Sequence, residues 1–352
     1  MASDRSRCRI VTLADVARDA GVSPMTVSRV INGETSVKSD TRKNVELSIK
    51  KLKYRPNIGA RRLAGAKVAR IGLLYDNPSS SYLGELLIGA VDAASKMGHQ
   101  LIVSRAEKSR VADMIADNMD QNWDGVILPS PIGEAPGVRK LIARENFPTV
   151  FLSGGAKPGR VKMSSASEVM IDNRRAAYEM TWMLIEQGHR RIGFIKGNQK
   201  HSGSALRYQG FCDAMEEAEL EVNPIYVEEG DFTYRSGMEA AERMLSFDPA
   251  PSAIFAGNDD MAAGVLAAGA RAGMITPGDL SVVGFDDSPI ATTVWPNLTT
   301  IRQPVADMAA AALEILESRI WPKTDSENTT PAQKIMDFSL VKRQSAAPPT
   351  RR

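Results

Sequence analysis

Residues 13–32 read "LADVARDAGVSPMTVSRVIN", and this stretch decides the fold of the N-terminal part of the chain. Thr12, just before it, suits the N-cap of a helix over residues 13–20, because Asp15 lies three positions later and completes a capping-box pair. An apolar stripe with helical spacing supports the same helix. Gly21 then provides the left-handed turn that ends it.

A second helix is predicted over residues 24–31. Ser23 supplies a cap, Pro24 suits the first helical position, and the asparagine–glycine pair that follows ends the run. A helix of little more than two turns is not stable by itself, so this one must pack against neighbouring helices. One neighbour is a third helix predicted over residues 40–52, capped by Ser39. A helix, a glycine turn and a second short helix form the helix-turn-helix layout, which places its second helix in the major groove of DNA.

The charges of the chain are unevenly distributed. Residues 1–67 contain 15 basic and 6 acidic side chains, which gives a net charge of +9. The remaining 285 residues contain 29 basic and 36 acidic side chains, which gives a net charge of −7. This polarity indicates a basic head for a polyanion, joined to a mildly acidic body. Charge alone is also compatible with a solvated basic tail.

The second predicted helix suggests how the head meets DNA. Its N-terminal residues, Pro24 and Met25, have no strong hydrogen-bond donor, so we expect them to contact a thymine methyl group. Arg29, one turn later, can reach guanine or a phosphate. The alternative for such a three-helix head is a protein-interaction module.

The quoted stretch closely resembles the DNA-binding signature of the LacI/GalR family. The similarity continues through "VKSDTRKNV" (residues 37–45) and "YRPNIGARRLAG" (residues 54–65). The resemblance implies a DNA-binding domain over residues 1–56. Relatives often carry polar base-reading residues where this chain has Pro24 and Met25, so no operator sequence can be transferred from them.

The resemblance further implies a hinge over residues 57–68 that folds into a short helix only on operator DNA. Leu63 would enter the minor groove with Ala60 beside it, since apolar wedges kink the duplex, while Arg61 would meet phosphates. The alternative is that Leu63 is an ordinary linker residue. The residues predicted to contact DNA are Thr12, Ser23, Pro24, Met25, Thr26, Ser28, Arg29, Asn32, Tyr54, Asn57, Ala60, Arg61 and Leu63.

From Ala69 onward, short apolar segments alternate with longer amphipathic ones. The predicted strands are residues 70–75, 100–104, 125–130, 148–153, 191–197, 224–230, 252–258 and 280–287. The predicted helices are residues 85–98, 111–122, 174–187, 203–219, 235–245 and 261–272. Such alternation is typical of an α/β fold with parallel sheets covered on both faces. Two successive series predict two subdomains whose strand ends face a shared crevice, where ligands bind.

This body resembles the LacI/GalR core, which is similar to periplasmic sugar-binding proteins. The resemblance implies an effector-binding core over residues 69–345, in which the chain crosses between the lobes near Asp172, Arg302 and Pro331. The implied N-subdomain comprises about residues 69–172 and 302–330, and the implied C-subdomain about residues 173–301 and 331–345. Residues 346–352 are expected to be a disordered tail.

The candidate effector-binding residues follow the predicted strands. They are Asn77, Ser79, Ser81, Tyr82, His201, Arg207, Phe232, Asn258, Asp286 and Gln303. Relatives grip the effector with an arginine at the position of Arg207 and stack an aromatic ring on it at the position of Phe232. An arginine, an aromatic ring, an amide and a carboxylate suit the hydroxyls and ring faces of a sugar.

Several of these positions have simpler interpretations. Phe232 could belong to the core, and His201 could be an exposed loop residue. Asp259 and Asp287 could only cap the turns or helices that follow them. Arg207 and Asp286 are the stronger candidates, because charged groups in a cleft need a partner.

Other functional classes find little support in the sequence. Neither the three histidines nor the two cysteines show metal-ligand spacing, and the phosphate-binding and nucleophile-elbow motifs are absent. We therefore expect no catalysis, no cofactor and no metal. The chain has no run of 18 apolar residues and no apolar core of a signal peptide, so a cytoplasmic location is expected.

Together these features predict a sequence-specific transcriptional repressor of carbohydrate-utilisation genes that a sugar effector, a mono- or oligosaccharide, releases from a pseudo-palindromic operator. A homodimer is expected, because the C-terminal segment lacks the apolar heptads of a tetramer-forming tail. The alternatives are a corepressor-dependent regulator, controlled by a purine or a partner protein, and a sugar receptor without DNA activity.

Overall fold

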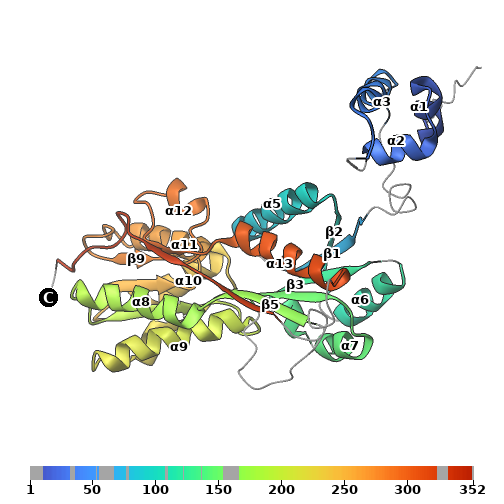
Figure 1. The fold of residues 1–352 in the computed structure, drawn as a ribbon. Helices are drawn as coiled ribbons and strands as arrows, with labels where there is room; N and C mark the ends of the chain where they lie inside the picture. The colour runs from blue at the N-terminus through green and yellow to red at the C-terminus, as the bar shows by residue number, and fades with distance from the viewer. Residues whose placement is uncertain are drawn as a thin grey trace, which may run out of the picture. The chain divides into compact units, whose positions relative to one another are not determined.

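The computed structural model divides the chain into two compact units, Met1–Val68 and Ala69–Arg352 (Figure 1). The described residues are 11–31, 36–52, 54, 67–76, 79–107, 110–121, 123–135, 137–153, 166–322 and 332–350.

The first unit contains three short helices around a small apolar core. They are α1 (Leu13–Ala20), α2 (Pro24–Ile31) and α3 (Ser39–Lys51). The predicted capping box is present, because Thr12 Oγ1 accepts from the Asp15 backbone N–H at 3.3 Å and Asp15 Oδ2 accepts from the Thr12 N–H at 2.9 Å. Gly21 adopts the left-handed conformation (φ +64°) and ends α1.

The other two helices of this unit are placed close to their predicted positions. Ser23 Oγ accepts from the Thr26 N–H at 3.1 Å at the start of α2. Ser39, predicted to cap the third helix, is instead its first residue, and no side chain caps α3. Val16, Val27 and Val45 are completely buried, one from each helix, so each helix is held by the other two.

The second unit consists of two α/β lobes, as predicted. The first lobe comprises β1 (Arg70–Tyr75), α5 (Ser80–Met97), β2 (Gln100–Arg105), α6 (Val111–Asp120), β3 (Gly125–Pro129), η1 (Ile132–Glu134), α7 (Val138–Glu145), β4 (Thr149–Leu152), β5 (Ala166–Ile171), α13 (Val305–Ile320) and β11 (Gln333–Met336). Its six strands form a parallel sheet in the order β11-β5-β4-β3-β1-β2.

Helices cover both faces of this sheet, which explains its nearly continuous apolar strands. Ile127 packs with the residues of α5 and α13 on one face. Its neighbours Val126 and Leu128 pack with α6 and α7 on the other face. Gly89 allows α5 and α13 to cross closely, because a Cβ atom at this position would lie 2.4 Å from Ala306 Cα.

The second lobe repeats this plan around a smaller sheet. It comprises α8 (Asn173–Glu186), β6 (Ile192–Lys196), α9 (Ser202–Glu217), η2 (Pro224–Tyr226), β7 (Val227–Glu229), α10 (Tyr234–Leu245), β8 (Ala253–Ala256), α11 (Asp259–Arg271), β9 (Ser281–Val283), α12 (Ile290–Thr293), β10 (Thr300–Arg302) and β12 (Ser339–Val341). The parallel sheet has the order β7-β6-β8-β9, and β10 pairs with β12 in an antiparallel ribbon.

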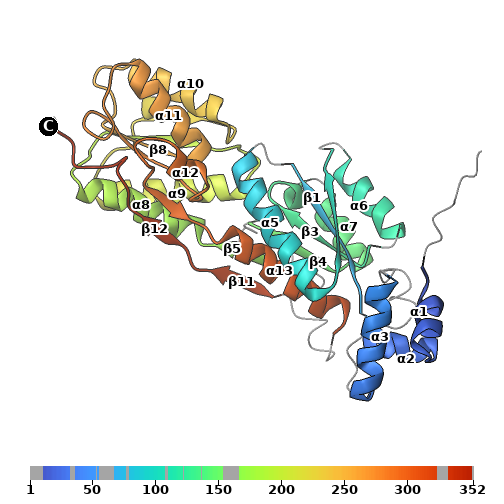
Figure 2. The ribbon, with the colours of Figure 1, turned by 90° about the horizontal axis from the view of Figure 1, so that it is seen from above.

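The chain passes between the lobes three times, and Figure 2 shows the two lobes from above. The first passage is at Asp172, between β5 and α8, and the second follows Arg302, between β10 and α13. The third passage does not lie near Pro331, where it was expected. Since β11 still pairs with β5 of the first lobe, the chain crosses at residues 337–338, between β11 and β12. β11 is a mostly exposed edge strand that mixes polar and apolar residues, so it lacks the apolar signal of the central strands.

The C-terminal segment is ordered further than expected. Residues 346–350 were expected in a disordered tail, yet Ala347 O accepts hydrogen bonds from His189 Nε2 at 3.0 Å and from Ser281 Oγ at 3.0 Å. Thr350 Oγ1 donates to Gly278 O at 2.6 Å. These bonds tie the segment to the second lobe through residue 350.

Candidate functional sites

The outer surface of α2 carries most of the predicted DNA-contacting residues that the structure describes. Met25 is 64% exposed, Pro24 and Arg29 are also exposed, and Thr26 and Ser28 are half-buried. Exposed apolar and cationic groups on one short helix, held by two neighbours, suit insertion into a groove. Thr12 and Ser23 are exposed at the N-termini of α1 and α2.

Tyr54 lies elsewhere than expected. It is only 7% exposed and packs in the core of the first unit, where burial raises the pKa of its hydroxyl. Its ring therefore stabilises the three helices instead of contributing to their outer surface. The remaining predicted DNA-contacting residues, Asn32, Asn57, Ala60, Arg61 and Leu63, lie outside the described residues.

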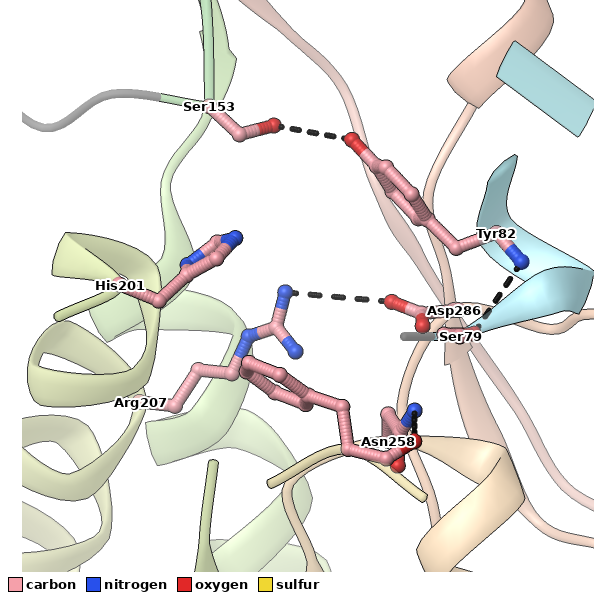
Figure 3. Close-up of a pocket in the computed structure, with 8 residues that line it drawn as sticks. Ser79, Tyr82, Ser153, His201, Arg207, Asn258 and Asp286 are labelled. Carbon is pink, nitrogen blue, oxygen red and sulfur yellow. Dashed lines mark hydrogen bonds and ion pairs between the residues drawn. The ribbon is translucent and has the colours of Figure 1, made fainter. Parts of the chain in front are cut away.

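A pocket lies between the two lobes of the second unit, at the C-terminal ends of parallel strands (Figure 3). Its free volume is about 20 Å³, room for about one water molecule, and it is called the effector pocket below. Its lining residues are Ser79, Tyr82, Ser153, His201, Arg207, Phe232, Asn258 and Asp286. Seven of these eight were predicted from the sequence; Ser153 was not.

Arg207 is the central cation of the effector pocket. It projects from α9, is 5% exposed, and lies over the Phe285 ring at 3.6 Å. Its Nε donates to Asn173 Oδ1 at 2.9 Å and its Nη1 donates to Gly257 O at 2.5 Å. Burial lowers the pKa of the guanidinium, whereas the Asp286 carboxylate opposes this shift. The protein thus holds the guanidinium in a fixed orientation.

Asp286 faces Arg207 across the pocket, with Oδ1 3.8 Å from Arg207 Nη2. The same oxygen accepts from Gln303 Nε2 at 2.6 Å. Burial raises the pKa of Asp286 to about 6, against the opposing effects of Arg207 and Gln303. Gln303, predicted to bind the effector directly, does not line the pocket, and its observed contact orients Asp286 instead.

An aromatic pair forms another part of the wall. The rings of Phe232 and His201 meet edge to face, with their centroids 5.2 Å apart. Phe232 is buried and belongs both to the core of the second lobe and to the pocket lining, so the two interpretations of this residue are compatible. His201 is buried, not exposed, and burial together with the nearby Arg207 lowers its pKa to about 3.

The remaining predicted residues connect the pocket to its helices. Asn258 caps α11 by accepting from the Met261 N–H at 3.0 Å, and it donates to Phe232 O at 3.0 Å. Ser79 caps α5, and the hydroxyls of Tyr82 and Ser153 lie 3.3 Å apart. Asn77 lies outside the described residues.

Two hydrogen-bonded bridges join the lobes beside the pocket. Asp260 accepts from Ser79 Oγ at 2.6 Å and from Ser81 Oγ at 3.2 Å. On the other bridge, Glu134 accepts from Ser202 Oγ at 2.7 Å and from the Ser202 N–H at 3.2 Å. The predicted residue Ser81 therefore acts between the lobes and does not line the pocket. Sequence reasoning missed Asp260 and Glu134, since acidic residues in the first turn of a helix are common and carry no distinctive signal.

Asp259 and Asp287 have structural roles that differ from helix capping. Asp259 is completely buried and accepts from Thr300 Oγ1 at 2.6 Å and from the Ser288 N–H at 2.8 Å. Burial, reinforced by Asp286, raises its pKa well above the usual value. Asp287 pairs with Arg302 and Arg343, each at 2.6 Å. Both residues hold the strand ends that carry Asp286.

Neither a metal site nor a membrane-spanning helix is present among the described residues. No group of three histidine, cysteine or acidic side chains in these ranges is arranged to hold a metal ion. In the same ranges, no helix has the length and apolar character needed to cross a membrane.

Comparisons with known sequence families agree with both units. Residues 12–57 match the bacterial regulatory proteins of the lacI family, and residues 182–346 match the periplasmic binding protein-like domain. The chain is 36% identical over 309 residues to Catabolite control protein A of Priestia megaterium, covering 87% of this chain and 91% of the relative. It is 33% identical over 341 residues to the HTH-type transcriptional repressor PurR of Serratia proteamaculans, and this match covers 96% of this chain and 97% of the relative.

Solved structures give the same result. The CelR–cellobiose complex is 32% identical, with a TM-score of 0.70 over 95% of this chain and 99% of that one. The lac repressor dimer bound to operator and the anti-inducer ONPF is 26% identical. Its TM-score is 0.77, and the match covers 96% of this chain and 100% of that one. Since similarity above 30% identity extends along nearly the whole of both chains, this chain belongs to the lacI family of bacterial regulatory proteins, and it is a DNA-binding transcription regulator and not an enzyme.

Proposed function

We propose that this regulator represses carbohydrate-utilisation genes and that a sugar bound in the effector pocket releases it from its operator. The observation that carries the proposal is the set of side chains enclosed between the lobes. A buried arginine, a carboxylate, an amide and an aromatic ring surround one small space. This combination matches a molecule with many hydroxyls and apolar ring faces better than a flat nucleobase, which needs stacking partners on both sides.

The proposed switch is a change in the arrangement of the two lobes. The bridges from Asp260 and Glu134 need the two lobes to lie close together, so a sugar that contacts both lobes would favour this same arrangement. The hinge proposed for residues 57–68 would then lose its helix on DNA. Such an order–disorder change is inexpensive in free energy and suits a switch.

A homodimer is part of the proposal. Two heads would read the two halves of a pseudo-palindromic operator. Ile88 and Val91 are 58% and 52% exposed on α5, and exposed apolar side chains on one helix suit a contact between two copies. Leu63→Ala should weaken operator binding by about tenfold or more, by removing the proposed wedge, while sugar affinity stays the same. Unchanged operator affinity in a mobility-shift titration would exclude the wedge.

A mobility-shift assay of the full-length protein on its operator, with increasing sugar, tests the direction of control. Release of DNA supports induction, whereas tighter binding supports the corepressor alternative, which the similarity to PurR keeps open. Arg207→Ala should abolish the response to sugar and leave operator binding intact. An unaltered response in this variant would remove Arg207 from the effector site.

A further inference from the structure

A second cavity lies on the other side of the segment that carries Asp286. Asp286 lines the effector pocket (Figure 3), whereas its neighbours Asp287 and Ser288 line this cavity, and no residue lines both. The cavity has a free volume of about 390 Å³, within the range of about 300–1,000 Å³ that is common for ligand sites. It is called the crossing pocket here, because the chain passes between the lobes along its wall. Its charged and amide side chains are Glu85, Asp287, Arg302, Gln303, Asp307 and Arg343.

The first lobe contributes two carboxylates to the crossing pocket. Glu85 lies one turn before Gly89 on α5, and Asp307 follows Ala306 on α13. Because α5 and α13 cross closely at Gly89 and Ala306, the two carboxylates come to the same cavity from different helices. Neither side chain forms a hydrogen bond or an ion pair with another described residue. Uncompensated carboxylates that line one cavity attract a cation.

The arginines of the second lobe do not supply this cation. Arg302 Nε and Arg343 Nη2 each lie 2.6 Å from the carboxylate of Asp287, so their charges are shared with that residue. Arg343 Nη1 donates to Leu298 O at 2.8 Å. The two terminal nitrogens of Arg302 form no hydrogen bond with the described residues, and this side chain is 56% exposed. The second lobe therefore offers one free edge of a guanidinium.

Gln303 provides an independent indication of a bound molecule. Its side chain is 95% buried and lines the crossing pocket, not the effector pocket. Its Nε2 donates to Asp286 Oδ1 at 2.6 Å, whereas its Oε1 has no hydrogen-bond partner among the described residues. A buried carbonyl oxygen without a donor is unfavourable, so a donor from outside the chain suits this position.

We infer that the crossing pocket binds a small organic ammonium compound, whose N–H groups donate to Gln303 Oε1 and to the carboxylates of Glu85 and Asp307. An ammonium group has donors and no acceptor, which matches a set of free acceptors. A ligand that also carries a carboxylate, as an α-amino acid does, would use the free edge of Arg302 as well. This site is separate from the effector pocket, and the inference does not depend on which molecule the effector pocket takes.

Titration calorimetry of the full-length protein at pH 7 with matched probes tests the inference. Ammonium compounds are compared with analogues that lack the ammonium group: alanine with lactate, phenylalanine with phenyllactate, and putrescine with 1,4-butanediol. We expect at least one ammonium compound to bind with a Kd below about 1 mM, and about tenfold or more tighter than its analogue. Weaker binding of all three ammonium compounds, or equal binding of the analogue, would overturn the inference.

The same titrations distinguish two sources of the ammonium group. Binding of alanine or phenylalanine without binding of putrescine identifies an amino acid, whose carboxylate uses Arg302. Binding of putrescine alone identifies a diamine, which uses only the acceptors. Either result supports the inference.

Isosteric variants locate the bound ammonium group. Glu85→Gln and Asp307→Asn each remove one negative charge from the crossing pocket and keep the size of the side chain. Each should weaken binding of the ammonium compound by about tenfold or more, because a charge-assisted hydrogen bond is lost. Asp113→Asn is the matched control, since it removes an exposed carboxylate from the first turn of α6 and lines neither cavity.

Two outcomes of the variant titrations contradict the inference. If Glu85→Gln and Asp307→Asn bind the ammonium compound as tightly as the unmodified protein does, the compound binds elsewhere. If Asp113→Asn weakens binding to the same extent, the effect comes from the overall charge of the protein and not from the crossing pocket.

Discussion

Asp286 is the residue where backbone strain, burial and charge coincide. Its φ of +114° lies in a region that favours glycine, and Asp287 next to it is also left-handed at +56°. Strain of this kind costs about 1–3 kcal/mol per residue and is found mostly at ligand sites. Here it turns two neighbouring carboxylates in different directions, one toward Arg207 and the other toward Arg302.

The raised pKa of Asp286 predicts a pH dependence of sugar binding. Sugar hydroxyls that donate to its carboxylate favour the ionised form, so the pKa of about 6 should fall on binding. Affinity should then be constant above about pH 7 and decline as the pH falls through 6, by up to about tenfold per unit of pKa difference. Calorimetry between pH 5 and 8 measures this decline.

Asp286→Asn is the control for this prediction. The variant should bind the sugar more weakly and show no decline near pH 6, because His201, with a pKa of about 3, does not titrate there. An identical decline in the variant would assign the effect to another group. The stability of the free protein changes with pH in the opposite direction. Because the pKa of Asp286 in the folded protein exceeds its ordinary value of 3.8, its ionisation reduces stability as the pH rises from about 4 to 6.

Individual site residues could be predicted only where a motif or a buried charge marked them. Arg207 and Asp286 were identified as the stronger candidates because charged groups in a cleft need partners, and the structure brings them together. Ser153 and Asn173 carried no comparable signal, since a serine after a strand is common and Asn173 lies 34 positions before its partner Arg207. Their roles depend on three-dimensional proximity across segments distant in sequence.

At the scale of elements, the contact between α5 and α13 depends on a single missing side chain. A Cβ atom at Gly89 would lie 2.4 Å from Ala306 Cα and 2.5 Å from its carbonyl oxygen. Gly84, on the same helix, has nothing within 4 Å of such an atom. Replacing each glycine by alanine therefore separates two effects: Gly84 tests helix propensity alone, and Gly89 tests helix propensity together with the close packing against α13.

Gly89→Ala should lower the free energy of unfolding of the second unit. Overpacking usually costs about 1–3 kcal/mol, and the gain in helix propensity from replacing a glycine offsets part of this cost. Gly84→Ala should raise the free energy of unfolding by about 0.5–1 kcal/mol. Denaturant unfolding followed by tryptophan fluorescence measures both, because all four tryptophans belong to the second unit. If both variants changed stability in the same direction, the close crossing would not be the cause.

Elements with strong local signals were predicted well, and those without them were not. The predicted helix at residues 13–20 coincides with α1, because a capping box and a glycine mark its ends. The strand β5 and the edge strand β11 were missed, since both mix polar and apolar residues. The apolar residues of α13 are mainly alanines, so its helical periodicity has little contrast. Its place in the first lobe was nevertheless expected.

At the scale of the whole second unit, the two bridges between the lobes should govern sugar affinity. Asp260→Ala removes the acceptor for Ser79 and Ser81 and so breaks a bridge that joins the two lobes. Hydrogen bonds to charged groups contribute about 1.5–3 kcal/mol, so the variant should bind sugar about 10- to 100-fold more weakly. Operator affinity without sugar should not fall.

Calorimetry with the variant and mobility shifts without sugar measure these two effects. Asp113→Ala, at an exposed residue of α6, removes an acidic side chain away from the bridges and serves as the control. Unchanged sugar affinity for Asp260→Ala would mean that closure does not depend on this bridge.

The three passages between the lobes also restrict how such a regulator can be recombined. A fragment ending at Asp172 would lack α13 and β11, which complete the first lobe from the far end of the sequence. Neither lobe is therefore a contiguous gene segment that could be transplanted alone. The segment that begins at Ala69 is the natural cassette, so hybrid regulators that combine one sensor with another reader should be spliced just before this residue.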